Sequence, residues 1–242
     1  STLRVVENAV IVTCAVSGVE VGTEQVFKYA KEAGIPCIFF INKMDRENAN
    51  FNKVMEQIRE LFGTKAVPFQ LPIGSEANFK GVVDIVAQKA YTFDGKGVKE
   101  CPIPDELKDE MENYRSMIME AVAETDDDLL MKYLEGEELT QDEIQKGLRI
   151  GVRQGDIYPI LCGSSLENKG ISLLMDTIVN YSASPADRPD EVGTKPGSDE
   201  EVTRKCSADE PFSALVFKTM ADPYVGKLTL FKVFSGSLKS DS

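Results

Sequence analysis

The feature that most constrains this chain is an apolar run, PCIFFI at residues 36–41, which stops abruptly at a polar motif. The motif is Asn-Lys-x-Asp, formed by Asn42, Lys43 and Asp45. A run without polar side chains predicts a strand covered on both faces, because a strand with one solvated face alternates apolar and polar residues. An amide, an ammonium and a carboxylate therefore follow a buried strand, which is where open parallel sheets bind their ligands.

The rest of the chain places this strand in an alternating pattern. Apolar runs are followed by amphipathic segments with helical spacing. We expect strands at residues 8–16, 36–41 and 157–162, and helices at residues 23–33, 50–62 and 171–181. Strands that alternate with helices pair in parallel, so the pattern predicts an α/β fold.

A segment of different character interrupts this pattern. Short strands separated by Gly- and Asn-containing turns come first, and three helical stretches follow. The short strands are expected at residues 66–73, 81–86 and 89–93. The segment predicts an inserted α+β subdomain.

Composition divides the chain into four parts. We expect residues 1–65 and 157–183 to form the α/β part, 66–156 the insert, 184–210 a linker and 211–242 the beginning of a β-barrel. The linker is expected because its sequence is rich in Pro, Gly, Ser and charge. The last part holds too few strands to close a barrel.

Composition also excludes several classes of function. The 242 residues include no histidine, which excludes His-based acid–base chemistry and His metal sites within this chain. The net charge of −13 disfavours a broad nucleic-acid face, so no direct nucleic-acid site is expected. No apolar run approaches the ~20 residues of a membrane span, and no membrane partner is expected. The five cysteines lack metal-type spacing, which favours reduced thiols.

The acidity is concentrated between Asp105 and Gln145, where fifteen Asp and Glu face three Lys and Arg. Such a segment is either a solvated helical surface or a docking face for a basic partner. Five carboxylates are expected opposite the apolar face of its first long helix: Glu106, Asp109, Glu110, Glu120 and Glu124. Both interpretations stay open.

The chemistry of the Asn-Lys-x-Asp motif suits a guanine base. The Asp45 carboxylate can accept the paired N1–H and N2–H of guanine, whereas adenine has no N2 amino group and presents N1 as an acceptor. Asn42 can donate to N7 and tie neighbouring loops together, and Lys43 can lay its stem over the base plane. The alternative is a polar strand-to-helix turn without a ligand.

A second buried strand, at residues 157–162, ends in Gly163, Ser164 and Ser165. A backbone N–H of this loop could reach guanine O6. Two strands that end in matching loops strengthen the guanine interpretation, because the carboxyl ends of parallel strands meet at one edge.

Several segments resemble the translational GTPases, specifically the elongation factor G family. INKMDR resembles its guanine-specificity motif, and LCGSSLENKG its Gly-Ser-Ala loop. LPIGSEANFKGVVDIV, KYLEGEELT and PFSALVFKTMADPYVGKLTLFKVFSG resemble its insert and the start of its second domain.

The resemblance implies the C-terminal part of a P-loop GTPase domain with a large α+β insert, followed by the start of a β-barrel domain. It implies that GTP or GDP is bound by Asn42, Lys43, Asp45, Ser164, Ser165 and Leu166. The P-loop, the Mg²⁺ ligands and the catalytic His of the family have no counterpart, since no G-x-x-x-x-G-K-[ST] occurs. We therefore expect no catalytic residue and no metal ligand here, and an inactive piece of a longer GTP hydrolase.

The resemblance also implies a cytoplasmic parent that drives tRNA–mRNA translocation on the ribosome, with the acidic insert contacting the basic stalk protein. The chain departs from the family pattern at two places. Ser165 replaces the usual Ala, and the resemblance implies that its backbone N–H still reaches guanine O6. VSGVEVGTEQV replaces a Glu-Gly-Val-Glu-Pro-Gln-Ser stretch, which leaves the subfamily open. A paralogue of elongation factor G, release factor 3 and ribosome-protection proteins remain alternatives.

Overall fold

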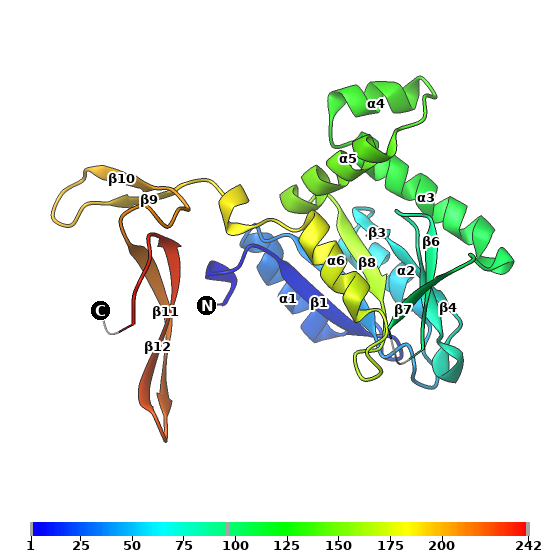
Figure 1. Cartoon of the computed structure of the whole chain (residues 1–242), viewed down its shortest axis with the longest axis horizontal. Coiled ribbons are helices and arrows are strands. Elements are labelled where there is room, and N and C mark those ends of the chain that lie inside the picture. Colours follow the sequence, from blue (N-terminus) through cyan, green and yellow to red (C-terminus); the bar gives the residue numbers. More distant parts are fainter. Residues whose placement is uncertain (1, 95–96, 241–242) are drawn as a thin grey trace. The chain divides into compact units, whose positions relative to one another are not determined.

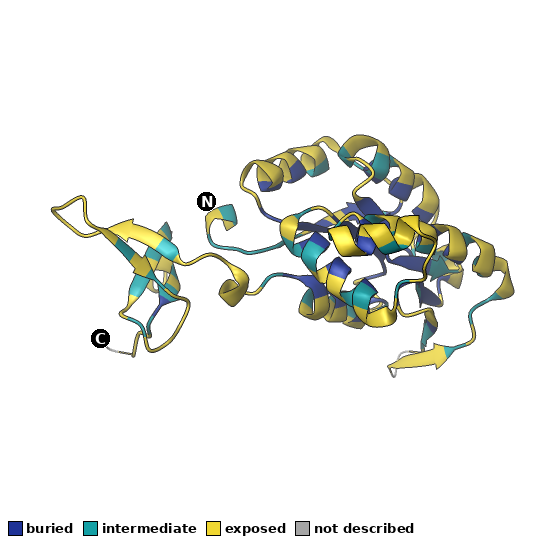
Figure 2. Cartoon of the chain, turned by 90° about the horizontal axis from the view of Figure 1, so that it is seen from above, coloured by how far each residue is buried: buried dark blue, intermediate teal, exposed yellow. Residues whose placement is uncertain are grey.

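The computed structural model describes residues 2–94 and 97–240, which form two compact units. Residues 8–182 make the larger unit, and residues 2–7 with 183–240 make the smaller one. Buried side chains are concentrated in the larger unit (Figure 2); Ser235 is the one buried residue among the described residues of the smaller unit.

A four-stranded parallel sheet forms the centre of the larger unit, in the order β1-β2-β8-β3 (Figure 1). Its strands are β1 (Ala9–Cys14), β2 (Cys37–Asn42), β8 (Tyr158–Cys162) and β3 (Ala66–Pro68). The helices that follow the strands are α1 (Val21–Glu32), α2 (Phe51–Phe62) and α6 (Ile171–Tyr181). The chain therefore has the α/β fold with a parallel sheet that its sequence predicts.

Aromatic side chains join α1 and α2 to one face of the sheet. Phe27 of α1 lies 4.3 Å from Phe62 of α2 and 5.7 Å from Phe39 of β2, measured between ring centroids. Tyr158 of β8 closes the cluster with an edge-on contact to Phe27 at 5.4 Å. In Figure 1, α6 lies on the other side of the sheet. Strand β2 is thus covered on both faces, and residues 37–41 are all buried.

Strand β1, unlike β2, is covered on one face only. Ile11 and Thr13 are buried, but Val10 is 39% and Val12 57% exposed. One face of β1 packs against the unit and the other is open, although the sequence of the strand is as apolar as that of β2. The burial of an edge strand depends on what lies beside it, which its own residues do not encode.

Residues 66–73 also differ from the prediction of a single strand in the insert. They form β3, in the parallel sheet, and β4 (Gln70–Ile73), in an antiparallel sheet. Phe69 connects the two sheets, because its N–H donates to Ile160 of β8 and its carbonyl accepts from Ile85. The insert therefore begins after β3, within a run that looks uniform in sequence.

The insert combines an antiparallel sheet with three helices. The sheet has the order β4-β5-β6-β7, with β5 (Gly81–Asp84), β6 (Lys89–Phe93) and β7 (Val98–Cys101), of which β7 was not expected. The helices are α3 (Lys108–Ala123), α4 (Asp127–Leu134) and α5 (Gln141–Gln154). Helix α3 buries Met111, Tyr114, Ile118 and Val122 along one side. Thr140 and Glu143 form a capping box at the start of α5, and Gly155 ends the helix with a φ of 73°.

The smaller unit contains two hairpins. One consists of β9 (Glu191–Thr194) and β10 (Glu201–Arg204), so the expected linker at 184–210 contains regular structure. Its turn includes Pro196 and Gly197, and such residues serve a hairpin turn as well as a linker. The other hairpin is β11 (Ser213–Asp222) with β12 (Gly226–Ser235).

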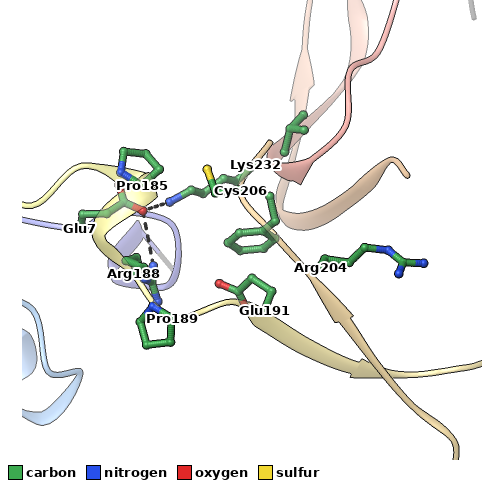
Figure 3. Close-up of a pocket in the computed structure, with 10 residues that line it drawn as sticks. Glu7, Pro185, Arg188, Pro189, Glu191, Arg204, Cys206 and Lys232 are labelled. Atoms are coloured by element: carbon green, nitrogen blue, oxygen red, sulfur yellow. Dashed lines mark hydrogen bonds and ion pairs between the residues drawn. The ribbon is translucent and has the colours of Figure 1, made fainter. Parts of the chain in front are cut away.

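A charged contact joins the first residues of the chain to the second hairpin, within the smaller unit (Figure 3). One oxygen of the Glu7 carboxylate accepts from Lys232 of β12 and from Arg188, the latter at 3.4 Å. The side chains of Glu7 and Lys232 are mostly buried, so screening by solvent is limited. The segment before β1 therefore belongs structurally to the C-terminal unit.

Candidate functional site

The site is formed by the two loops that leave β2 and β8. The strands pair in parallel with Ile41 opposite Cys162, so both loops leave the same edge of the sheet. Asn42 joins them: its Oδ1 accepts from the Ser165 N–H at 2.9 Å, and its Nδ2 donates to Ser165 Oγ at 2.9 Å. These residues are 123 positions apart in the sequence. The structure thus brings the two predicted loops together.

The backbone reinforces this connection. The Met44 N–H donates to the Gly163 carbonyl at 3.1 Å, and the Lys43 N–H donates to Asn42 Oδ1 at 2.8 Å. Lys43 has a φ of 66°, which is uncommon for a residue with a side chain. Its side chain is exposed, so the ammonium is available to a ligand.

The side chain of Asp45 has a polar atom that the described residues leave without a hydrogen bond. Its Oδ1 is buried and has no hydrogen-bond partner in the part of the chain that the structure describes. Leaving a buried acceptor unpaired costs ~1–3 kcal/mol, so such an atom needs an explanation. A ligand with an N–H group directed at Asp45 would satisfy it, and the N1–H and N2–H pair of guanine provides one.

The remaining predicted residues lie on the loop after β8. Ser164 is fully buried, pairs with Lys169 through two backbone hydrogen bonds of 2.9 Å, and accepts at Oγ from the Glu167 N–H. Leu166 is 79% exposed. The Ser165 N–H, expected to reach guanine O6, is engaged here by Asn42. The Leu166 N–H makes no hydrogen bond among the described residues, which leaves this donor free for a ligand.

Cys14 is a neighbour of the site that sequence reasoning missed. It ends β1 and pairs with Asn42. Burial acts to raise the pKa of its thiol, but hydrogen bonds with the backbones of Ser17 and Val16 and the Ser17 side chain, together with the Lys43 ammonium, hold the pKa below its ordinary value. By contrast, burial raises the pKa of Cys37 to about 12 and that of Cys162 further, as expected for core thiols.

The acidic docking candidates lie along α3 and its ends. Glu106 lies in a short 3-10 helix before α3, Asp109 and Glu110 lie in its first turn, and Glu120 and Glu124 lie at its C-terminal end. Glu106, Asp109, Glu120 and Glu124 are exposed. Glu110 is half-buried and accepts from the Tyr114 hydroxyl at 3.2 Å. The structure therefore leaves four of these five carboxylates fully available to solvent or a partner.

No helix within residues 2–94 and 97–240 is long and apolar enough to cross a membrane. No group of three or more His, Cys, Asp or Glu side chains within the same ranges could hold a metal ion.

Comparison with known proteins gives two findings. The model of the family described as the elongation factor Tu GTP binding domain matches residues 1–184. A crystal structure of a protein from Thermus thermophilus is similar, with a TM-score of 0.81 and 28% sequence identity. The match covers 98% of this chain and 33% of that one, so this chain spans about a third of the length of the Thermus protein.

Proposed function

The chain belongs to the family of the elongation factor Tu GTP-binding domain, and on this premise we propose that its Asn42–Asp45 loop recognises the guanine base of GTP or GDP. The observation that carries the proposal is the buried Oδ1 of Asp45, which has no hydrogen-bond partner among the described residues and lies three residues after Asn42, the residue that joins the two loops. A guanine base supplies the N–H groups that this carboxylate lacks.

The arrangement explains how the base would be selected. Guanine directs two donors at the Asp45 carboxylate, whereas adenine would direct the acceptor N1 at it and leave the carboxylate unpaired. Sites built to hydrogen-bond a substrate discriminate strongly for this reason, by ~10⁴-fold or more in the best cases. Asn42 has a second amide N–H for N7, because the first is used by Ser165. The Lys43 stem would cover the base, and the Leu166 N–H would donate to O6.

The parent activity is proposed on the resemblance to elongation factor G. In that protein this chain would supply base recognition, and residues outside the present sequence would bind the phosphates and Mg²⁺ and catalyse GTP hydrolysis. The parent would act in the cytoplasm, on the ribosome, during translocation. Release factor 3, a ribosome-protection protein or a paralogue of elongation factor G is the alternative.

Docking of a basic partner is a second candidate function. It is favoured by the exposure of Glu106, Asp109, Glu120 and Glu124 along α3 and at its two ends. The basic stalk protein of the ribosome is the proposed partner, and a solvated surface without a partner is the alternative.

Replacement of Asp45 tests base recognition. In Asp45→Asn an NH₂ group replaces one acceptor oxygen and faces the N–H donors of guanine. The free energy of GDP binding should therefore become less favourable by about 2–3 kcal/mol. Xanthosine diphosphate has an oxygen at C2 and should bind the variant better than GDP. We would follow the amide NMR signals of residues 42–48 and 163–169 while each nucleotide is added.

Asp199→Asn is the control, since Asp199 is an exposed aspartate of the smaller unit. It should keep the wild-type response to both nucleotides. If Asp45→Asn also keeps the wild-type preference for GDP, Asp45 does not read the base.

A further inference from the structure

One residue of the insert contacts the guanine-site loop on both sides of Asp45. The Glu76 N–H donates to the Met44 carbonyl at 2.9 Å, and Glu76 Oε1 accepts from the Asn48 N–H at 2.7 Å. Because Asp45 lies between Met44 and Asn48 in the chain, Glu76 holds the loop before and after the carboxylate.

The same short segment of the insert also contacts the second loop of the site. Lys169 Nζ donates to the Phe79 carbonyl at 2.8 Å and lies 5.9 Å from the centroid of the Phe79 ring. The backbone of Lys169 pairs with Ser164. Residues 76–79 therefore connect to both loops that surround the proposed base.

The backbone of these segments depends on such contacts. Lys43, Asn48 and Glu76 have φ values of 66°, 64° and 56°, which cost free energy in residues other than glycine. The turn before Glu76 is tight, since a Cβ on Gly74 would lie 2.2 Å from the Asn78 carbonyl oxygen. Conformations of this kind persist where surrounding contacts stabilise them. At the Asp45 loop, Glu76 supplies two such contacts, with Met44 and with Asn48.

We propose that Glu76 is a positioning residue of the guanine site, which fixes the Asp45 carboxylate from the insert and so couples the insert to base affinity. The proposal rests on the proposed function, because it takes Asp45 as the group that reads guanine. Glu76 itself contacts the loop and not the base. If a partner bound to the insert displaced residues 76–79, the orientation of the Asp45 carboxylate would change.

Three variants of the 242-residue chain test the proposal. Glu76→Ala removes the acceptor of the Asn48 N–H, and Glu76→Gln keeps an acceptor oxygen at the same place. Glu47→Ala removes a different, exposed carboxylate of the same loop and is the matched control. Two readouts are needed: hydrogen exchange of the Asn48 amide without nucleotide, and affinity for GDP from the shift of the Asp45 amide signal.

We expect Glu76→Ala to accelerate exchange at Asn48 about tenfold and to weaken GDP binding by a similar factor, as the loss of one hydrogen bond implies. Glu76→Gln should restore both values, and Glu47→Ala should change neither. A merely structural role would leave GDP affinity unchanged while the exchange rate rises.

The outcomes separate this proposal from the proposed function. If the wild-type Asp45 signal does not respond to GDP at any concentration tested, guanine recognition itself is wrong. If the wild type responds and Glu76→Ala binds GDP equally well, Asp45 reads the base but Glu76 does not position it.

Discussion

The side chain of Asn42 makes three hydrogen bonds, two of them with Ser165. Its side-chain oxygen accepts from the N–H groups of Lys43 and Ser165, and its side-chain nitrogen donates to Ser165 Oγ. Since Ser165 lies on the other loop, one amide group orders the two loops relative to each other. Asn42 therefore has a structural role, in addition to the ligand contact that we propose for it.

We predict that Asn42→Ala lowers the free energy of unfolding of the larger unit by about 2 kcal/mol, because three hydrogen bonds are lost and each contributes about 0.5–1.5 kcal/mol net. Asn42→Asp should cost less, since a carboxylate keeps both acceptor contacts. Urea unfolding measures the difference.

Asn52→Ala is the control for this prediction, because Asn52 is exposed on α2. It should change the free energy of unfolding by less than about 0.5 kcal/mol. Equal values for Asn42→Ala and Asn52→Ala would mean that the Asn42–Ser165 contact does not stabilise the protein.

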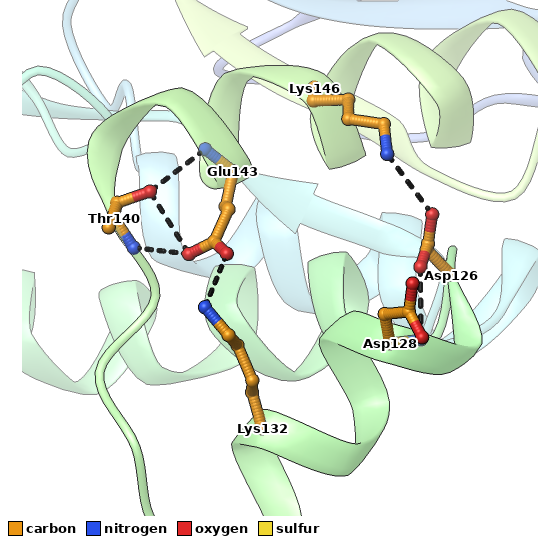
Figure 4. Close-up of polar contacts among 6 residues, drawn as sticks. All are labelled: Asp126, Asp128, Lys132, Thr140, Glu143 and Lys146. Carbon is orange, nitrogen blue, oxygen red and sulfur yellow. Dashed lines mark hydrogen bonds and ion pairs between the residues drawn. The ribbon is translucent and has the colours of Figure 1, made fainter.

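At the scale of elements, α4 is held to α5 by charged contacts at the start of α5 (Figure 4). The Glu143 carboxylate accepts from the Thr140 N–H at 2.9 Å, the Thr140 hydroxyl at 3.0 Å and Lys132 Nζ at 2.6 Å. Lys146 of α5 pairs with Asp126, the residue before α4, at 3.3 Å. The Lys132 contact, followed by the Thr140 contacts, lowers the pKa of Glu143 from its ordinary 4.5 to about 2.

This shift predicts a pH-dependent contribution to stability. The pKa of Glu143 is lower in the folded state than in the unfolded state, so its contribution is complete above about pH 4.5 and is lost as the pH falls toward 2. Glu143→Gln should be less stable than the wild type at pH 6, and the difference should close over that range. Urea unfolding between pH 2 and 6 measures it.

Glu138→Gln is the matched control, because Glu138 is an exposed glutamate in the loop between the same helices. Its difference from the wild type should stay near zero at each pH. A difference for Glu143→Gln that does not depend on pH would contradict the lowered pKa.

At the scale of the whole molecule, the proposed guanine site stands in a sequence without a P-loop motif, since no G-x-x-x-x-G-K-[ST] occurs. We predict that the 242-residue chain neither hydrolyses GTP nor binds it with a sub-micromolar dissociation constant. Phosphate binding relies on charge-assisted bonds from a P-loop and a helix N-terminus, which a base pocket does not replace. Calorimetry and phosphate-release assays check this, and phosphate release above a buffer blank would refute it.

The acidic insert gives a second prediction at this scale. Reversal of the exposed Glu106, Glu120 and Glu124 to Lys should slow association of the whole factor with ribosomes if the segment docks a basic partner, since charge complementarity acts on the encounter rate. Wild-type association should also slow with salt, as the Debye length falls from about 10 Å at 0.1 M to about 3 Å at 1 M. Glu110 is left in place to preserve its contact with Tyr114.

The control reverses three exposed acids of the smaller unit, Asp199, Glu201 and Asp209, and changes the net charge equally. Stopped-flow association should be near the wild-type rate for this control and slower for the α3 variant. Equal rates for all three proteins at low salt would make the acidic segment a solvated surface.

The sequence by itself determined the elements that local chemistry defines. Residues 37–41 form a buried strand because every side chain is apolar. The Asn-Lys-x-Asp motif directly follows this strand, so it lies at the carboxyl end of the parallel sheet. Thr140, Glu143 and Gly155 fix the ends of α5 through contacts within a few residues. The two loops of the candidate site were predictable for the same reason.

Tertiary structure decided what depends on distant neighbours. β1 is half exposed and residues 66–73 split between two sheets, because pairing and cover come from other segments. Ser165 gives its N–H to Asn42, and Glu76 reaches the Asp45 loop from the insert. Hydrogen bonds between residues so far apart in the sequence depend on the tertiary fold. Local sequence patterns therefore do not predict them.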